Sequence, residues 1–372
     1  VPQANIFRRM LLKSSRGQVL EDIDNYDMLC RIQQNLKSEA TLKGEAFSSK
    51  DIRAVDVAKT FGNMTNATGQ NMRHHLQSGI LGDHQEFLIP VSSMVASSGF
   101  AFQLELFLND DAKVVGSTNT SPASYSLEEV SYDMELVEVS DAIMADINSE
   151  LSSGSQIPLP YKSWRSHNTA LSGAGTQHKV DIAESAINAE KIYSVVVPQS
   201  WTQKQSVDAT KYLGTDYDPY TFYGGRKKLS ASGAFTSPTD YVTKYNWRYG
   251  STYYPSAPIE LNQDSTVALE TTLSTFDLKG NELPFMTAQE TDGSGATNRF
   301  ESRDFILAHN FNKTPEKMRA GLNLANSGAP VSLSLHFNSN PNASVAKAIQ
   351  TFIESSNTLY IKPDGASSLV AN

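Results

Sequence analysis

Alternation of apolar and polar residues with a period of two is the feature that most constrains the fold of this chain. The segments 102–108, 130–136 and 331–337 each place an apolar residue at every second position. Successive side chains of a strand point to opposite faces of a sheet, so this pattern predicts strands with one buried face. Two short runs of β-branched and aromatic residues, 193–197 and 359–361, predict further strands. The chain is therefore predicted to be all-β.

Helical patterns are few and short. An apolar stripe from Val19 to Cys30, with spacings of four, three and four residues, predicts a helix with this stripe on its buried face. Cys30 is the single cysteine, so the chain has no internal disulfide, and its position on the stripe predicts a core side chain. Apolar residues three and four apart predict two more short helices, over 141–151 and 344–353.

The length and the loops of the chain predict two β-sandwiches in tandem. The chain has 372 residues, which corresponds to about two domains at roughly 150 residues each. Long segments rich in Gly, Ser, Pro, Asp and Tyr separate the predicted strands, and 224–237 offers the most natural break. We therefore predict a basic N-terminal arm over 1–18, a first sandwich over 19–228 and a second sandwich over 229–372.

The distribution of charge excludes nucleic-acid binding by the surface as a whole. Lys and Arg number 31 against 40 Asp and Glu, which gives a formal net charge of −9. The N-terminus differs, because Arg8, Arg9, Lys13 and Arg16 all precede the first acid, Glu21. These bases fit either a frayed terminus or an arm that contacts phosphate on nucleic acid or lipid head groups. No stretch of the sequence has the ~18 consecutive apolar residues of a membrane span.

Sequence signatures of catalysis and cofactor binding are absent. The chain contains no GxxxxGK[ST] phosphate loop and no GxGxxG, HExxH, CxxC or GxSxG motif. His74 and His75 are adjacent, so their side chains diverge and form a poor metal chelate. The runs 216–220 and 224–228 are typical of turns and solvated loops, although the first would suit a cation and the second a subunit or nucleic-acid contact. We predict no catalytic residue, no metal site and no cofactor.

An ordered series of short segments runs through most of the chain. In the first half a turn leads into an Ile-Pro strand, a strand ends in a polar turn, and another strand precedes a helix. In the second half an aromatic strand is followed by a Tyr-Pro-x-x-Pro turn and then by closing strands. In order and spacing the series resembles the double jelly-roll major capsid proteins of icosahedral DNA viruses, the lineage of tectiviruses, adenoviruses, virophages and polinton-like viruses. The segments are 79–91, 99–111, 125–139, 245–250, 253–259, 321–323, 331–337 and 359–365.

The resemblance implies two tandem eight-stranded jelly-roll β-sandwiches with a few short helices and long loops. It implies a structural protein of the virion, made in the host cell, that trimerises into pseudo-hexameric capsomers and tiles an icosahedral shell. The implied partners are further copies of the chain, neighbouring capsomers, and penton and minor capsid proteins. The resemblance implies neither catalysis nor a cofactor. In this setting the arm with Arg8, Arg9, Lys13 and Arg16 would face the interior and contact a membrane or the genome.

Two other classes of function stay open at this point. A Tyr- and Asp-rich loop, 215–223, would suit a carbohydrate- or ligand-binding β-sandwich such as a lectin or an adhesin. A β-sandwich hydrolase would need a pair of carboxylates that no motif marks. A stable trimer favours the capsid protein, whereas a monomer that binds glycans favours the lectin-like domain.

Overall fold

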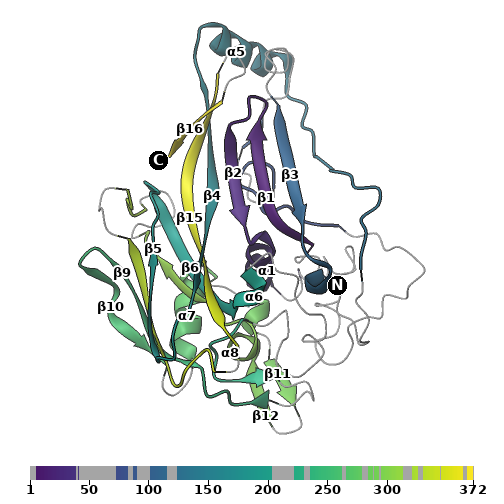
Figure 1. Cartoon of the computed structure of the whole chain (residues 1–372). Helices are drawn as coiled ribbons and strands as arrows, with labels where there is room; N and C mark the ends of the chain where they lie inside the picture. The colour runs from purple at the N-terminus through teal and green to yellow at the C-terminus, as the bar shows by residue number, and fades with distance from the viewer. Residues whose placement is uncertain are drawn as a thin grey trace.

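A computed structural model gives the fold of the chain. Figure 1 shows an elongated molecule in which long strands run side by side and short helices lie at the ends and between the sheets. The residues that the structure describes are 6–38, 41, 73–82, 87–89, 101–114, 124–202, 222–229, 235–261, 265–278, 284–287, 289–292, 295–312, 321–325, 330–343, 345–362 and 367–371.

The N-terminal part of the chain forms a three-stranded antiparallel sheet. Its strands are β1 (Phe7–Ser14), β2 (Val19–Asp24) and β3 (Phe102–Leu108), in the order β2-β1-β3. Met10 and Leu12 of β1 point into the core, whereas Arg9 and Lys13 alternate with them on the outer face. A helix, α1 (Tyr26–Leu36), follows the sheet and is buried along most of its length.

The rest of the described chain forms two larger sheets and two small two-stranded sheets, β7-β8 and β11-β12, with short helices beside them. One sheet has the order β10-β9-β14-β5, and in the other β15 pairs with β4 along one side and with β6 and β16 along the other. These elements are α4 (Asp111–Val114), α5 (Asp141–Ser152), β4 (Ile157–Ala170), β5 (Gln177–Ile182), β6 (Ala189–Pro198), α6 (Gln199–Thr202), β7 (Lys228–Leu229), β8 (Phe235–Thr236), β9 (Val242–Tyr249), β10 (Thr252–Glu260), α7 (Thr266–Thr275), the 3-10 helix η4 (Phe285–Thr287), β11 (Gln289–Asp292), β12 (Gly295–Asn298), α8 (Arg299–Ser302), β13 (Leu307–Asn310), β14 (Val331–Phe337), β15 (Lys347–Ile361) and β16 (Ser367–Ala371).

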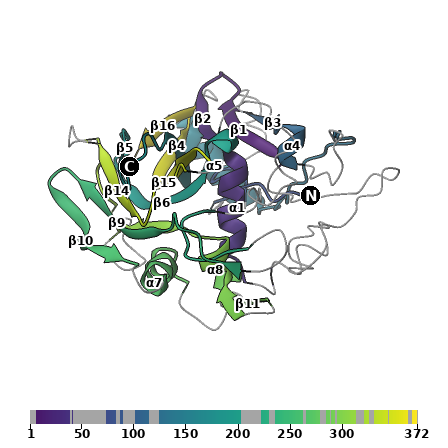
Figure 2. The same cartoon turned by 60° about the horizontal axis from the view of Figure 1, so that its bottom comes forward.

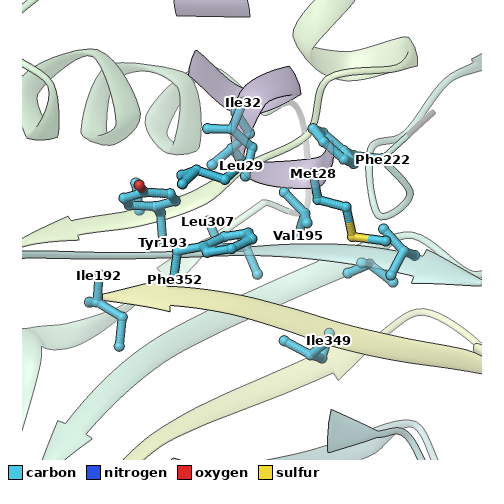
Figure 3. Close-up of a cluster of buried hydrophobic side chains, with 14 of the residues drawn as sticks. Met28, Leu29, Ile32, Ile192, Tyr193, Val195, Phe222, Leu307, Ile349 and Phe352 are labelled. Carbon is cyan, nitrogen blue, oxygen red and sulfur yellow. The ribbon is translucent and has the colours of Figure 1, made fainter. Parts of the chain in front are cut away.

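The largest hydrophobic core joins α1 to the second half of the chain. Figure 3 shows side chains of α1, among them Met28, Leu29 and Ile32, packed over Tyr193 of β6 and Phe352 of β15. The rings of these last two residues lie 5.9 Å apart between centroids. Because apolar surface is stabilised by removal from water, this contact fixes the first sheet on the second half of the molecule. In Figure 2, α1 lies between the β1–β2 hairpin and α8.

The all-β prediction is confirmed, with several strands where the periodicity placed them. The predictions for 102–108 and 331–337 correspond to β3 and β14, and 193–197 and 359–361 lie within β6 and β15. The predicted helix over 141–151 is α5. Cys30 is a buried core residue, as its place in the apolar stripe indicates.

The predicted helix from Val19 to Cys30 is wrong in its first half. Val19–Asp24 is strand β2, and the helix begins at Tyr26 after Asn25, whose φ of 51° is left-handed. Residues four apart share a side in a strand as well as a face in a helix, so the spacing fits both structures. Pairing with β1 determines which of them forms.

The predicted helix over 344–353 is also wrong, because Lys347–Ile361 is the long strand β15. Both faces of this strand are buried, and polar residues such as Gln350 and Thr351 are buried alongside Ile349 and Phe352. A strand covered on both faces loses its period-two pattern, so the apolar residues that remain imitate helical spacing.

The predicted boundary at 228/229 does not separate the sheets. β15 pairs with β4 and β6, and β14 pairs with β5, so strands from both sides of that position lie in the same sheets. Sheet membership instead divides the described strands between β3 and β4, on either side of α5. The loop composition predicts a domain boundary at this position, but strands on its two sides pair with each other.

A loop over residues 73–82 is held between β2 and β4. The buried carboxylate of Glu21 accepts hydrogen bonds from the Ser78 hydroxyl and from the Gly79 amide, the latter at 2.9 Å. Burial raises the pKa of Glu21 to about 7, although these hydrogen bonds favour its charged form. Gly79 lies so close to β4 that a Cβ would be 1.7 Å from the carbonyl oxygen of Lys162.

We expect Gly79→Ala to lower the free energy of unfolding by more than about 1 kcal/mol, because backbone must move to admit the methyl group. Urea denaturation measures the change. Gly175→Ala is the matched control, since its nearest atom is 3.8 Å away, and it is expected to be neutral or to stabilise by up to about 1 kcal/mol. Equal effects of the two substitutions would contradict the close approach of the loop to β4.

Glu21 is expected to make stability fall as pH rises. Its pKa is raised from 4.5 to about 7 in the folded chain, so between these values the unfolded chain loses a proton that the folded chain keeps. Relative to the wild type, the free energy of unfolding of Glu21→Gln should therefore rise by about 3 kcal/mol from pH 4.5 to 7.5. Urea denaturation across this range tests the prediction, which a pH-independent difference would exclude.

Glu184 provides a control of opposite sign. Burial raises its pKa, but the hydrogen bond with His167 and the amide of Ser185 outweigh burial and lower the pKa overall. The unfolded chain then binds the proton first as pH falls, and stability is lost toward acid. Relative to the wild type, Glu184→Gln should therefore gain stability in urea denaturation as pH falls below the ordinary glutamate pKa of 4.5.

Candidate assembly surface

The basic residues predicted as an N-terminal arm lie mostly on a strand within the sheet. Residues 7–14 form β1, the middle strand of the first sheet, with β2 on one side and β3 on the other. The segment is therefore not a free arm. The alternation of Met10 and Leu12 with Arg9 and Lys13 is the sequence signal for this strand.

Three of the four predicted contact residues form ion pairs on the first sheet. Arg9 binds Asp22 through two hydrogen bonds, Nε to Oδ1 at 2.8 Å and Nη2 to Oδ2 at 2.6 Å. The hydrogen bond with Asp22 is the main cause of a raised pKa of Arg9. In addition, Arg8 Nη1 lies 3.1 Å from an oxygen of Asp24, and Lys13 Nζ lies 2.7 Å from an oxygen of Glu105.

These ion pairs change what the basic segment offers to a partner. Acids on the neighbouring strands, which follow the bases by ten or more positions, compensate their charge across the sheet. The fourth residue, Arg16, lies in the exposed turn between β1 and β2, next to Gly17 with its φ of 79°. The structure thus brings Arg8, Arg9 and Lys13 together with acids and places Arg16 at the tip of the hairpin.

A second surface is more unusual and comprises residues 124–140, which we call the acidic segment. It contains Glu128, Glu129, Asp133, Glu135 and Glu138 and no Lys, Arg or His. The period-two pattern over 130–136 predicts a half-buried strand, and the structure contradicts this. The backbone forms no ladder within the described chain, and the apolar side chains are exposed.

Exposure of the apolar side chains is the distinctive property of the acidic segment. Val130 is 72% exposed, Met134 is 61% exposed and Leu136 is 73% exposed. Two tyrosines attach the segment to the first sheet and its loop, because Tyr125 donates to the Asn109 carbonyl at 2.7 Å and Tyr132 donates to the Leu81 carbonyl at 2.6 Å. Clustered exposed apolar residues with a charged surround are typical of interaction sites.

α5 continues this surface beyond the acidic segment. The helix adds Asp141, Asp146 and Glu150, again without a base, and Leu151 is its one fully buried residue. Ile143 in its first turn is half exposed. The acidic segment and α5 therefore form a continuous acidic and apolar surface, and Figure 1 shows their backbone along the right side and the top of the molecule.

The remaining candidate residues from the sequence are the basic run 224–228, the acidic run 216–220 and any group of metal ligands. Arg226 of the basic run donates to the Leu261 carbonyl at 3.1 Å and stacks over Tyr241 at 4.9 Å from the ring centroid. The acidic run 216–220 lies outside the described residues. Within the described ranges, no group of three His, Cys, Asp or Glu side chains is placed to hold a metal ion, and no helix there combines the length and the apolar character needed to cross a bilayer.

Comparison with known proteins places this arrangement among solved folds. No protein-family model matches the sequence, and a search of curated proteins finds no match. By structure, the chain is similar to VP54 of PBCV-1 as fitted into a cryo-EM reconstruction of the virophage Sputnik, with 12% identity and a TM-score of 0.56. It is also similar to a chain of the quasi-atomic model of the PBCV-1 virus capsid, with 10% identity and a TM-score of 0.57. Each comparison covers 100% of this chain and 85% of the other. The fold is therefore the double jelly roll, two jelly-roll β-sandwiches in one chain.

Proposed function

We propose that this chain is a major capsid protein, which trimerises into pseudo-hexameric capsomers that tile an icosahedral shell in the virion. The observation that carries the proposal is the extent of the structural similarity, which covers the whole of this chain and most of a chain from a virus capsid. An acidic surface that concentrates exposed apolar side chains supports an assembling protein over a monomeric one.

The proposal assigns a structural role without catalysis or a cofactor. The lectin-like alternative rested on the loop 215–223, of which the structure describes Phe222 and Tyr223. Phe222 is buried against Arg31, whose guanidinium carbon lies 4.3 Å from the ring centroid. The Phe222 ring is therefore part of the core and is not exposed to stack on a sugar.

Self-association is the first test of this function. The purified chain is expected to form a stable particle of three times its 40.7 kDa mass, measured by light scattering and sedimentation. At high concentration, electron microscopy should show hexagonally arranged, two-lobed particles. A chain that stays monomeric at all accessible concentrations would contradict the proposal, and binding to a glycan array by that monomer would favour the lectin-like function.

We further propose that the β1–β2 turn is the part of the basic N-terminal segment that faces the particle interior. There it would contact penton or minor capsid proteins, or an enclosed membrane or genome. Arg16 lies in the exposed turn between β1 and β2, whereas Arg8, Arg9 and Lys13 lie on strand β1 itself. Removal of residues 1–18 would also remove β1, so a point substitution is the cleaner test.

Arg16→Glu is expected to leave trimer formation unchanged and to weaken binding of the trimer to anionic vesicles or to DNA by several fold. Co-sedimentation at low salt measures both. Arg165→Glu on β4, where the side chain is 62% exposed, is the matched control and should have no such effect. Equal losses from the two substitutions would indicate a general charge effect and would exclude a specific role of the turn.

A further inference from the structure

The acidic segment has the sequence pattern of a strand but belongs to no sheet. Residues 130–139 have no regular secondary structure, and no backbone hydrogen bond joins them to another described part of the chain. Val130, Tyr132, Met134 and Leu136 alternate with polar residues, as the residues of β14 do. The apolar residues of β14 are buried and those of the acidic segment are exposed. Such a strand gains hydrogen bonds and buried surface by adding to the edge of another sheet.

Charge excludes the edges of the first sheet as acceptors. The outer face of β2 carries Asp22 and Asp24, and that of β3 carries Glu105. Like charges directly opposite one another destabilise a strand pair. A strand that contributes Asp133 and Glu135 to the outer face is therefore disfavoured at both edges.

Proline and length disfavour strand addition at the described edges of β10, β4 and β13. β10 contains Pro255 and Pro258, and its pairing with β9 is interrupted there. β4 contains Pro158 and Pro160 and is approached by the loop at Gly79. Proline has no amide hydrogen to donate to a ladder, so it protects an edge against addition of a strand. β13 has four residues, which is too short for a match to the acidic segment.

β5 is the edge that fits. It ends the order β10-β9-β14-β5 and contains no proline. Val180 and Ile182 point into the core, while Lys179 and Asp181 lie on the outer face, are about half exposed and form an ion pair at 2.8 Å. An added strand with apolar residues on its inner side and a carboxylate opposite Lys179 would extend both faces of this sheet.

The acceptor edge belongs to a second copy of the chain. The acidic segment runs along the right side of Figure 1, whereas β5 lies on the left, and the same separation holds in Figure 2. A segment on one side that fits an edge on the opposite side produces a head-to-tail contact, and such contacts form a ring when the rotation between subunits closes. This is the geometry that a cyclic trimer requires, so the inference rests on the proposed function.

We propose that residues 130–136 of one subunit add as an antiparallel edge strand to β5 of the next, with Asp133 opposite Lys179. This register places Tyr132 opposite Val180 and Val130 opposite Ile182, so that apolar residues meet on the inner face. Shifts by two residues in either direction place Asp133 or Glu129 opposite Asp181, where like charges repel. A shift by one residue turns the apolar residues outward.

Docking in this register replaces a hydrogen bond within the subunit by a contact with the neighbouring subunit. The Tyr132 hydroxyl leaves the carbonyl of Leu81, to which it donates at 2.6 Å, and its ring packs against Val180 of the neighbour. The two arrangements are alternatives for the same side chain. Tyr132→Phe removes the hydrogen bond but keeps the ring, so the trimer of this variant should be as stable as that of the wild type or more stable.

Charge reversal with rescue tests the pairing. Lys179→Asp is expected to raise the trimer dissociation constant by about tenfold or more, because the aspartate then lies opposite Asp133. Adding Asp133→Lys should restore the affinity. Sedimentation equilibrium measures the constants, and thermal unfolding checks that each monomer is folded. Both sites are on exposed faces, so the substitutions leave the core intact.

A disulfide between subunits tests the geometry. The single native cysteine, Cys30, is buried, so cysteines introduced by Asp133→Cys and Lys179→Cys report on their own contact. On oxidation this pair should yield covalently linked trimers. Asp133→Cys with Lys244→Cys is the matched control, because Lys244 lies on β9, two strands away from β5 in the same sheet, and cannot be bridged.

The outcomes separate this inference from the proposed function. A wild-type trimer that is weakened by Lys179→Asp, rescued by the second reversal and crosslinked by the first cysteine pair supports both. A wild-type trimer that neither reversal affects, or that crosslinks equally well in the control, overturns the strand addition and leaves the capsid function standing. A wild-type chain without self-association overturns both.

Discussion

Pairing of β15 with strands on both of its sides is the interaction on which the rest of the structure depends. β15 pairs with the whole length of β4 along one edge, and with β6 and then β16 along the other. It is buried on both faces, so its backbone groups have no access to water and must be bonded within the sheet. Residues near the end of the chain thereby join segments that start almost 200 positions earlier.

The first sheet depends on this strand through α1. The helix packs Met28, Leu29 and Ile32 onto β6 and β15, and both of its ends are bonded to the second half of the chain. At the N-terminal end, Asn25 donates to Gln350 of β15 at 2.9 Å. At the other end, Asn35 donates at 2.8 Å to Asp304, which also pairs with Arg299 at 3.0 Å. Because buried polar groups need specific partners, these bonds determine how α1 is seated on the sheet.

Sequence periodicity predicted those strands whose two faces have different surroundings. β14 has a core on one side and polar neighbours on the other, and its alternation is unambiguous. The same pattern over 130–136 indicates a strand with one apolar face. The pattern does not show whether residues of the same chain bury that face, and in the structure they do not. The first half of β15 was predicted as a helix for the opposite reason, since cover on both faces erases the alternation, whereas the strand predicted over 359–361 is its end. The candidate arm was misjudged because the acids that pair with Arg9 and Lys13 lie on other strands.

The residues at the sheet edges explain how one chain can be stable alone and still assemble. An open edge with an apolar face invites pairing with any strand, which is why native sheets protect their edges. Here acids line β2 and β3 and prolines interrupt β10, whereas β5 contains no proline and carries Lys179 beside its one acid, Asp181. The acidic segment carries five carboxylates beside its apolar residues, so two such segments repel each other. The carboxylates of the acidic segment thus prevent its apolar residues from pairing with a second acidic segment. A base at the edge of a sheet, such as Lys179 on β5, complements this charge.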